Sequence, residues 1–205
     1  MAIHFLLETM DQPNKRRRIL DAAVEVFSRY GFYNSKVAQV AKAAGVADGT
    51  IYLYFKSKED ILIQVFVDTM ELANSKQRMA MEGLTSAPEK LRTFVRVHFE
   101  LVGQNPSLAE VLTVELRQSS KFMRDSDVRP FGRYLGIIGR IVAEGQAAGD
   151  FSPDVKPRTI ARMLFGAIDE LSLEWSMSSR SKSVEDAYSQ TVRVFLAGLR
   201  RTDRA

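Results

Sequence analysis

Hydrophobic residues recur three and four positions apart along most of the chain, whereas the strict alternation typical of a half-buried strand is scarce. This periodicity predicts an all-α protein. Glycines and prolines interrupt the pattern and mark where helices begin and end. About nine helices are expected, over residues 14–30, 36–44, 49–55, 58–82, 88–104, 107–118, 120–149, 158–177 and 183–201.

Capping residues define the predicted helix ends near the N-terminus. Gly31 and Gly45 follow the first two helices and can adopt the left-handed backbone that commonly ends a helix. Four side chains able to accept a backbone N–H stand at the starts of the first four helices, namely Asn14, Ser35, Asp48 and Ser57. The helix over residues 120–149 is expected to be interrupted near Pro130.

The clearest break in the pattern lies at residues 83–88, after the long fourth helix. The chain has 205 residues, of which 45% are hydrophobic and 26% charged, so it can bury cores for two domains and is not expected to be disordered. We place the boundary at the fourth helix, which gives domains over residues 12–60 and 61–203.

Residues that carry out catalysis or bind metals are scarce. The absence of cysteine excludes disulfides, a thiolate nucleophile and a cysteine-bearing zinc site. The two histidines are His4 and His98, and no glycine-rich phosphate loop occurs. We therefore expect no enzyme, no catalytic residues, no metal site and no cofactor.

The first ten residues make a poor signal peptide. Their apolar patch at residues 3–7 is short, has no basic residue before it, and is followed by Glu8 and Asp11. No segment approaches the ~20 apolar residues that a membrane-spanning helix needs. A cytoplasmic protein without membrane contact is expected.

Positive charge is concentrated near the N-terminus. Residues 12–58 contain nine Lys or Arg against three Asp or Glu, an excess of +6, so with a total of +4 the rest of the chain carries −2. This distribution favours a polyanionic partner at one end of the protein. A basic surface that is merely solvated is the alternative.

The helices predicted over residues 36–44 and 49–55 have the spacing of a helix-turn-helix. Gly45 permits the tight turn between them, and Val46 fills the angle that they enclose. In such a motif the second helix enters the major groove, with Ile51 and Phe55 facing the core. Many α-helical domains contain a similar pair of helices without binding DNA, so the spacing alone leaves both possibilities open.

The run VAQVAKAAGVADGTIYLYFKSKEDIL at residues 37–62 resembles the DNA-binding signature of the TetR family of bacterial regulators, and the similarity covers residues 12–65. One departure is Ser35, where the family often has threonine. The resemblance implies a homodimer that represses transcription from a palindromic operator, with recognition helices roughly 34 to 36 Å apart. It implies DNA contacts at Ser35, Lys36, Asp48, Gly49, Thr50, Tyr52, Tyr54 and Lys58, to which Arg16 and Arg17 are added for their charge.

The C-terminal domain contains two further runs, LTVELRQS with Phe122-Met123 after it, and FGAIDE at residues 165–170. These resemble segments of the fatty-acid-degradation (FadR-type) repressors of the family, which implies long-chain acyl-CoA as effector and fatty-acid-degradation genes as targets. Apolar residues at helical spacing are candidates for the acyl tunnel: Phe99, Val102, Leu112, Leu116, Phe122, Met123, Leu135, Ile138, Met163 and Phe165. Basic candidates for the coenzyme A phosphates are Arg117, Lys121, Arg124 and Arg133.

Other interpretations of the same residues stay open. An apolar stripe is often plain core, and a lone arginine is often a surface charge. A regulator of efflux or other metabolism that binds drug-like or aromatic ligands is the alternative function, and its acids would come from Glu115, Asp169, Glu170 and Glu174. An enzyme that processes acyl-CoA is a remote third possibility.

The last two predicted helices are candidates for the dimer interface. Each carries apolar residues at helical spacing, and a pair from each protomer would form a four-helix interface. Trp175 favours this interpretation, because tryptophan is enriched at interfaces. Burial of the same faces within one chain is the alternative. The residues concerned are Leu164, Ile168, Leu171, Trp175, Val192, Phe195, Leu196 and Leu199.

Overall fold

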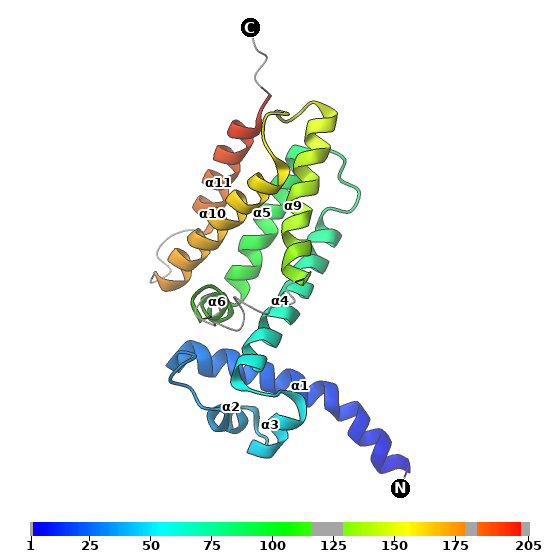
Figure 1. Cartoon of the computed structure of the whole chain (residues 1–205), viewed down its shortest axis with the longest axis vertical. Coiled ribbons are helices and arrows are strands. Elements are labelled where there is room, and N and C mark those ends of the chain that lie inside the picture. The colour runs from blue at the N-terminus through cyan, green and yellow to red at the C-terminus, as the bar shows by residue number, and fades with distance from the viewer. Residues whose placement is uncertain (1, 116–128, 179–183, 202–205) are drawn as a thin grey trace. The chain divides into compact units, whose positions relative to one another are not determined.

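A computed structural model of the protein describes residues 2–115, 129–178 and 184–201 (Figure 1). Its regular elements in these ranges are all helices, which confirms the all-α prediction. They are α1 (Ala2–Tyr30), α2 (Val37–Ala44), α3 (Asp48–Tyr54), α4 (Lys58–Ala80), α5 (Ala87–Gln104), α6 (Pro106–Glu110), the π-helix η1 (Val111–Glu115), α9 (Arg129–Ala148), α10 (Pro157–Met177) and α11 (Val184–Leu199).

The chain forms two compact units. The N-terminal unit comprises Met1–Phe66 with Glu110–Ser126, and the C-terminal unit comprises Val67–Ala109 with Asp127–Ala205. The first division therefore falls inside α4, slightly later than the position predicted from the sequence. The N-terminal unit also includes η1, which follows α6 in the chain and packs against α1.

The core of the N-terminal unit is formed by α1, α2, α3 and α4, and each helix contributes the residues of one face. The spacing of these residues is helical, so each helix turns a single apolar stripe inward. The stripes predicted for the first and fourth helices are confirmed as buried. The core contains Ile19, Ala23, Val26, Phe27, Val40, Ala41, Ile51, Phe55, Ile61, Leu62 and Val65.

Three predicted caps are wrong. The first helix begins at Ala2, so Asn14 lies within it, because residues 2–12 include strong helix formers and extend the helix. Ser35 does not cap α2, since its hydroxyl donates to the Phe32 carbonyl at 2.7 Å and Lys36 is the N-cap residue. Asp48 is the first residue of α3 rather than its cap, in a position where a carboxylate suits the helix dipole.

The cap of α4 is confirmed. The Ser57 hydroxyl accepts the Asp60 N–H at 3.1 Å, and the Asp60 carboxylate accepts the Lys56 N–H at 2.8 Å. Two side chains thus satisfy backbone donors on either side of the helix start. The sharp entry into α4 is fixed by local hydrogen bonds.

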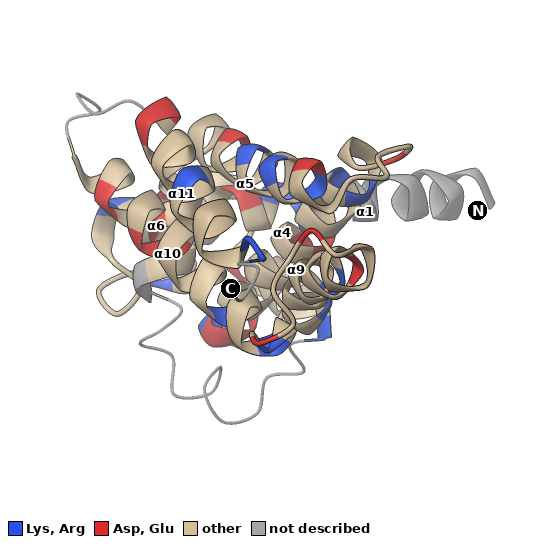
Figure 2. Ribbon diagram, turned by 90° about the horizontal axis from the view of Figure 1, so that it is seen from above, with Lys and Arg blue, Asp and Glu red and all other residues tan. Residues whose placement is uncertain are grey.

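The C-terminal unit is a helical bundle in which α9 packs against α5 and α10, and α11 packs against α5 and α10 (Figure 1). Its core includes Phe94, Tyr134, Ile138, Leu164 and Ile168, each at most 1% exposed. In Figure 2 both charge colours occur on these helices, so the charges of this unit are mixed rather than segregated.

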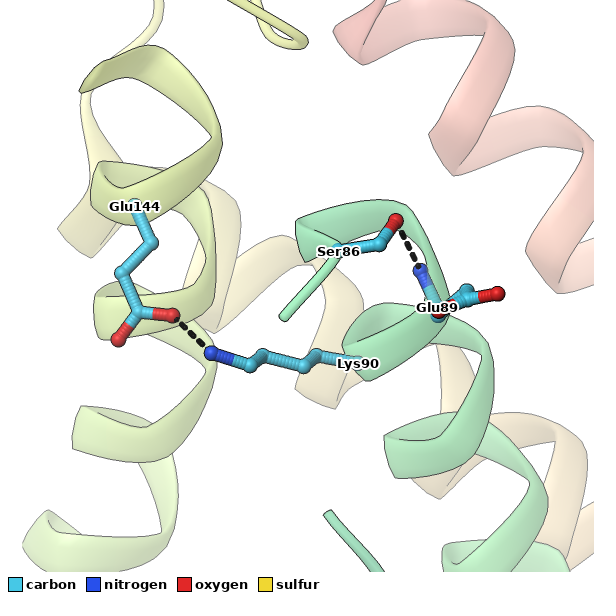
Figure 3. A network of polar contacts seen from close by, with 4 residues as sticks. All are labelled: Ser86, Glu89, Lys90 and Glu144. Atoms are coloured by element: carbon cyan, nitrogen blue, oxygen red, sulfur yellow. Dashed lines mark hydrogen bonds and ion pairs between the residues drawn. The ribbon is translucent and has the colours of Figure 1, made fainter. Parts of the chain in front are cut away.

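An ion pair joins α5 and α9. Lys90 Nζ lies 2.6 Å from a Glu144 carboxylate oxygen (Figure 3). At the start of α5 the Ser86 hydroxyl accepts the Glu89 N–H at 3.4 Å, so this helix begins just before the predicted Pro88.

The segment after α6 departs from the expected helix over residues 107–118. Its α-helical part ends at Glu110 and continues as the π-helix η1, a rare form that is frequent at functional sites. The first part of the helix expected over residues 120–149 lies outside the described residues, and α9 begins at Arg129, next to the predicted interruption.

Candidate nucleic-acid interface and effector site

The turn between α2 and α3 has the geometry of a helix-turn-helix. Gly45 adopts a left-handed backbone with φ of 64°, and its N–H reaches carbonyls of the last turn of α2. Val46 then donates its N–H to the Ala41 carbonyl at 3.0 Å. Only glycine adopts this backbone without strain, so the predicted role of Gly45 is confirmed.

An arginine from α1 braces this turn. Arg18 Nη2 donates to the Ala44 carbonyl at 2.6 Å and lies 3.3 Å from the Gly45 carbonyl. A guanidinium at the C-terminal end of α2 also compensates the negative end of the helix dipole. Arg18 therefore holds the angle between the two helices.

The side chains of α3 divide between the core and the solvent. Ile51 and Phe55 are 1% and 2% exposed and face the core, as predicted. Tyr52 is 61% exposed and Leu53 is 82% exposed, and Gly49 is exposed at the helix start. This helix presents a surface of small, hydroxyl-bearing and apolar groups, the kinds of group that contact base edges and phosphates.

The Lys58 ammonium group binds backbone carbonyls of the same unit. Its Nζ donates to the carbonyls of Phe32, Tyr33 and Ser35 at 2.6, 3.2 and 2.9 Å, and it lies 4.5 Å from the centre of the Phe32 ring. Ser35 is only 3% exposed. The structure thus places these two predicted phosphate contacts where they fasten the loop between α1 and α2 to the start of α4.

The other basic residues of the predicted set differ in their surroundings. Arg16 donates to the Gln64 side chain at 3.1 Å, and its guanidinium lies 5.8 Å from the centre of the Phe55 ring. Arg17 is exposed and forms an ion pair with Asp21 at 2.9 Å. Lys36 is exposed at the N-terminus of α2, where the helix dipole favours an anion.

The sequence interpretation missed two exposed residues beside this motif. Tyr33 is 62% exposed in the loop before α2, and its ring lies edge to face with the Phe32 ring, with the two ring centres 5.5 Å apart. Leu53 is the most exposed large apolar residue of α3. The aromatic run YGFY at residues 30–33 is a signal that could have found Tyr33.

The C-terminal unit brings part of the predicted acyl tunnel together. Phe99 and Ile138 are buried in one core cluster, and Phe165 packs against it; the Phe165 and Phe131 rings meet edge to face, with their centres 4.9 Å apart. Met163, in contrast, is 57% exposed and does not line this core. Val102, Leu112 and Leu135 are half-buried.

Of the basic residues predicted to contact the coenzyme A phosphates, only Arg133 lies among the described residues. Arg133 is exposed and forms an ion pair with Glu71. Residues predicted at the tunnel and its mouth that lie outside the described residues are Leu116, Arg117, Lys121, Phe122, Met123 and Arg124.

A chain of polar side chains crosses the core of this unit. The Tyr134 hydroxyl lies 2.9 Å from His98 Nδ1, His98 Nε2 lies 3.2 Å from the Ser172 hydroxyl, and that hydroxyl donates to the Ile168 carbonyl at 2.6 Å. Because Ser172 has a single proton, His98 must donate to it and accept from Tyr134. Burial lowers the pKa of His98 to about 4, so its ring is neutral at pH 7. Burial likewise raises the pKa of Tyr134.

The residues predicted for the dimer interface fall into two groups. Leu164, Ile168 and Leu199 are at most 2% exposed and belong to the core of their own chain, as the intramolecular alternative holds. The half-buried group is Leu171, Trp175, Val192, Phe195 and Leu196. Large apolar residues exposed on the same two helices are Met163, Met177 and Val194.

Two structural findings concern other kinds of function. No helix in the described part of the chain is long and apolar enough to cross a membrane. Within the same residues, no group of three or more His, Asp or Glu side chains is placed to hold a metal ion.

A helix-turn-helix with an exposed second helix, followed by a separate helical bundle, defines a DNA-binding regulator with a second domain. Comparisons with known families agree with this class. Residues 19–65 match the family described as bacterial regulatory proteins, tetR family, and residues 66–198 match the YsiA-like protein, C-terminal region. The chain belongs to the TetR family, and it is a transcriptional regulator rather than an enzyme.

Several relatives are fatty acid regulators. The chain is 36% identical to the fatty acid metabolism regulator protein of Bacillus subtilis over 90% of its own length and 95% of the relative's. Its fold matches the fatty acid degradation regulator FadR of Bacillus halodurans with a TM-score of 0.84, at 36% identity over 92% and 97% of the two chains. It also matches Bacillus subtilis FadR in complex with stearoyl-CoA, with a TM-score of 0.83, at 36% identity over 89% and 98%.

Proposed function

We propose that this regulator is a repressor which binds a palindromic operator as a homodimer and leaves it when long-chain acyl-CoA binds the C-terminal unit. Genes of fatty-acid degradation are the proposed targets. The observation that carries the proposal is the similarity, across nine tenths of the chain, to a FadR that was crystallised with stearoyl-CoA. A signal that accumulates when fatty acids are available suits the control of their degradation.

The proposed DNA contacts come from the exposed side of the helix-turn-helix. Gly49, Thr50, Tyr52 and Tyr54 of α3 would meet the major groove, and Lys36 a flanking phosphate. Asp48 stays a minor contact beside them, and Arg17 an outer one. Ser35, Lys58 and Arg16 are engaged inside the unit, so we assign them the task of holding its shape.

The proposed effector site lies among the helices of the C-terminal unit. The apolar cluster around Phe99, Ile138 and Phe165 supplies the kind of lining that an acyl chain requires. Leu112 belongs to η1, which packs against α1 of the DNA-binding unit. The Glu110 carboxylate, just before η1, accepts from the Ser28 hydroxyl of α1 at 3.5 Å.

This arrangement suggests how the signal reaches the DNA-binding unit. Leu112, one of the residues proposed to meet the ligand, lies in η1, which belongs to the N-terminal unit. An effector that favours a different position of η1 or α4 would alter the spacing of the recognition helices. Differential binding worth ~1 to 3 kcal/mol per effector would change operator affinity 5- to 150-fold.

A drug-like or aromatic effector is the alternative. Its proposed acids Glu170 and Glu174 are exposed on α10, whereas Asp169 is half-buried. Buried carboxylates suit cationic ligands, so Asp169 is the residue that would favour this alternative. An acyl chain needs no such acid.

Operator release tests the proposed function. Operator DNA selected from random sequence should bind the protein, and palmitoyl-CoA at micromolar concentration should release it in a gel-shift or anisotropy assay. Tyr52→Ala should abolish operator binding without changing palmitoyl-CoA affinity, because Tyr52 lies on the exposed side of α3. A protein that stays on its operator at saturating palmitoyl-CoA, yet is released by cationic dyes, would establish the alternative.

A further inference from the structure

Two amide side chains of α4 lie in the core of the C-terminal unit with only part of their hydrogen-bonding capacity in use. Asn74 and Gln77 are 1% and 0% exposed. Asn74 donates to the Pro130 carbonyl at 2.9 Å, and Gln77 donates to the Phe94 carbonyl at 2.9 Å. Their own side-chain carbonyl oxygens, Asn74 Oδ1 and Gln77 Oε1, are buried and accept no hydrogen bond from the described residues.

Rearrangement of the two amides would not pair these oxygens. Turning either amide round would aim its oxygen at the Pro130 or Phe94 carbonyl, which cannot donate. The neighbouring Tyr134 hydroxyl has one proton, and the chain through His98 to Ser172 already uses it. Buried carbonyl groups are almost always paired in folded proteins, so two unpaired ones on a single helix require an explanation.

Their placement matches a ligand with two donors. Residues three apart on a helix lie on the same face, with Cβ atoms about 5 to 6 Å apart. Both oxygens are therefore acceptors on one face of α4, among residues of α5 and α9. Neutral amide oxygens favour a neutral N–H or O–H donor over a phosphate.

We propose that Asn74 Oδ1 and Gln77 Oε1 accept the two amide N–H groups of the pantetheine arm of a bound acyl-CoA. This inference rests on the proposed acyl-CoA response. The acyl chain has no donor, and the thioester oxygen only accepts. The pantetheine arm, in contrast, carries two amide groups joined by two methylene carbons, so its donors are spaced for acceptors one helical turn apart.

A ligand bound at this site would contact α4 directly. This helix begins at Lys58 in the N-terminal unit and carries Asn74 and Gln77 in the C-terminal unit. Both oxygens are buried beside α5 and α9, so the arm reaches them only if this face of α4 moves away from those helices. Binding at these oxygens therefore selects a different position of α4.

Two substitutions of similar shape test the site, Asn74→Leu and Gln77→Met. Calorimetric titration should show each variant binding palmitoyl-CoA about three- to tenfold more weakly than the wild type, which is the worth of one hydrogen bond. Palmitate, which lacks the arm, should bind both variants as it binds the wild type. Gln104→Met makes the same chemical change at an exposed position of α5 and should leave both affinities unchanged.

The outcomes separate this inference from the proposed function. Wild-type protein that binds no palmitoyl-CoA overturns the proposed function and the inference with it. Wild-type protein that binds palmitoyl-CoA while both variants keep its affinity overturns the inference alone, as does an equal loss for palmitate. If the variants fail to fold, side-chain amide NMR signals of Asn74 and Gln77 in the wild type provide the test: they should shift with palmitoyl-CoA and stay in place with palmitate, and identical shifts would overturn the site.

Discussion

At the scale of single residues, the basic side chains of the N-terminal unit do not all have the same role. The local excess of +6 marks the end of the protein that meets DNA. Yet Arg16, Arg18 and Lys58 donate hydrogen bonds to side-chain or backbone oxygens within the same unit. Because a cation that is bound to carbonyls is less available to phosphates, a count of basic residues overestimates the number of DNA contacts.

Lys58→Met, compared with Lys36→Met, should distinguish a lysine that stabilises the fold from a lysine that contacts a DNA phosphate. Loss of its contacts with three carbonyls should destabilise the N-terminal unit by about 2 kcal/mol and weaken operator binding, while the slope of log affinity against log salt stays unchanged. Lys36→Met should instead lower that slope by about 1, as loss of one phosphate contact does. Anisotropy titrations at several salt concentrations measure both. If Lys58→Met also lowers the salt slope, Lys58 contacts a DNA phosphate after all.

The lowered pKa of His98 predicts a pH dependence of stability. The unfolded chain protonates this ring below about pH 6.5 and the folded chain only below about pH 4, so unfolding takes up a proton between these values and stability falls with falling pH. The difference corresponds to about 3 kcal/mol. Urea denaturation between pH 7 and pH 4 should show this loss. His98→Gln keeps one donor and one acceptor and should flatten the dependence; an equally steep loss in that variant would contradict the assignment.

At the scale of elements, local signals and packing contribute differently to helix ends. Gly45 and Ser57 act as the sequence predicts, because a left-handed turn and a side-chain cap involve only neighbouring residues. Ser35 was equally plausible as a cap, but burial beneath Lys58 directs its hydroxyl to the Phe32 carbonyl instead. The π-helix η1 has no local signature in the chain. It packs against α1, which is far away in sequence.

Gly145→Ala tests the packing of α9 against the loop that follows it. A Cβ atom at this position would lie 2.2 Å from Phe151 Cδ2, so the Phe151 ring must shift. Overpacking of this kind should destabilise the protein by about 1 to 3 kcal/mol. Gly132→Ala on the same helix has no atom within 4 Å of the added Cβ and should be neutral or stabilising by about 0.5 to 1 kcal/mol. Thermal unfolding of the two variants compares them; equal midpoints would refute the contact.

At the scale of the whole molecule, the proposed dimer depends on surfaces that one chain leaves uncovered. The helices α10 and α11 bury Leu164, Ile168 and Leu199 in their own core, which the apolar stripe alone could not distinguish from an interface. Met177 and Val194 remain exposed on the same helices. An interface between protomers is therefore expected on these outer faces.

Val194→Arg should convert the proposed dimer into single protomers, because Val194 is 64% exposed and the substitution places a charge on the proposed interface without disturbing the core. Met79→Arg introduces the same charge at a similarly exposed residue of α4, which is 71% exposed, and should leave the dimer intact. Sedimentation velocity reports the mass of each. A Val194→Arg protein that sediments as the wild type does would place the interface elsewhere.

The sequence by itself determined the helical class, the helix-turn-helix, the family and the kind of effector to test, because these depend on periodicity, on turn chemistry and on a long contiguous motif. It also marked which residues are apolar enough to line a tunnel. Tertiary structure alone decided which of them are core and which basic residues are bound within the protein. It alone also showed that the Asn74 and Gln77 side-chain oxygens are buried and have no hydrogen-bond partner among the described residues. The physical reason is that burial and hydrogen-bond pairing depend on residues from α4, α5 and α9, which only folding brings together.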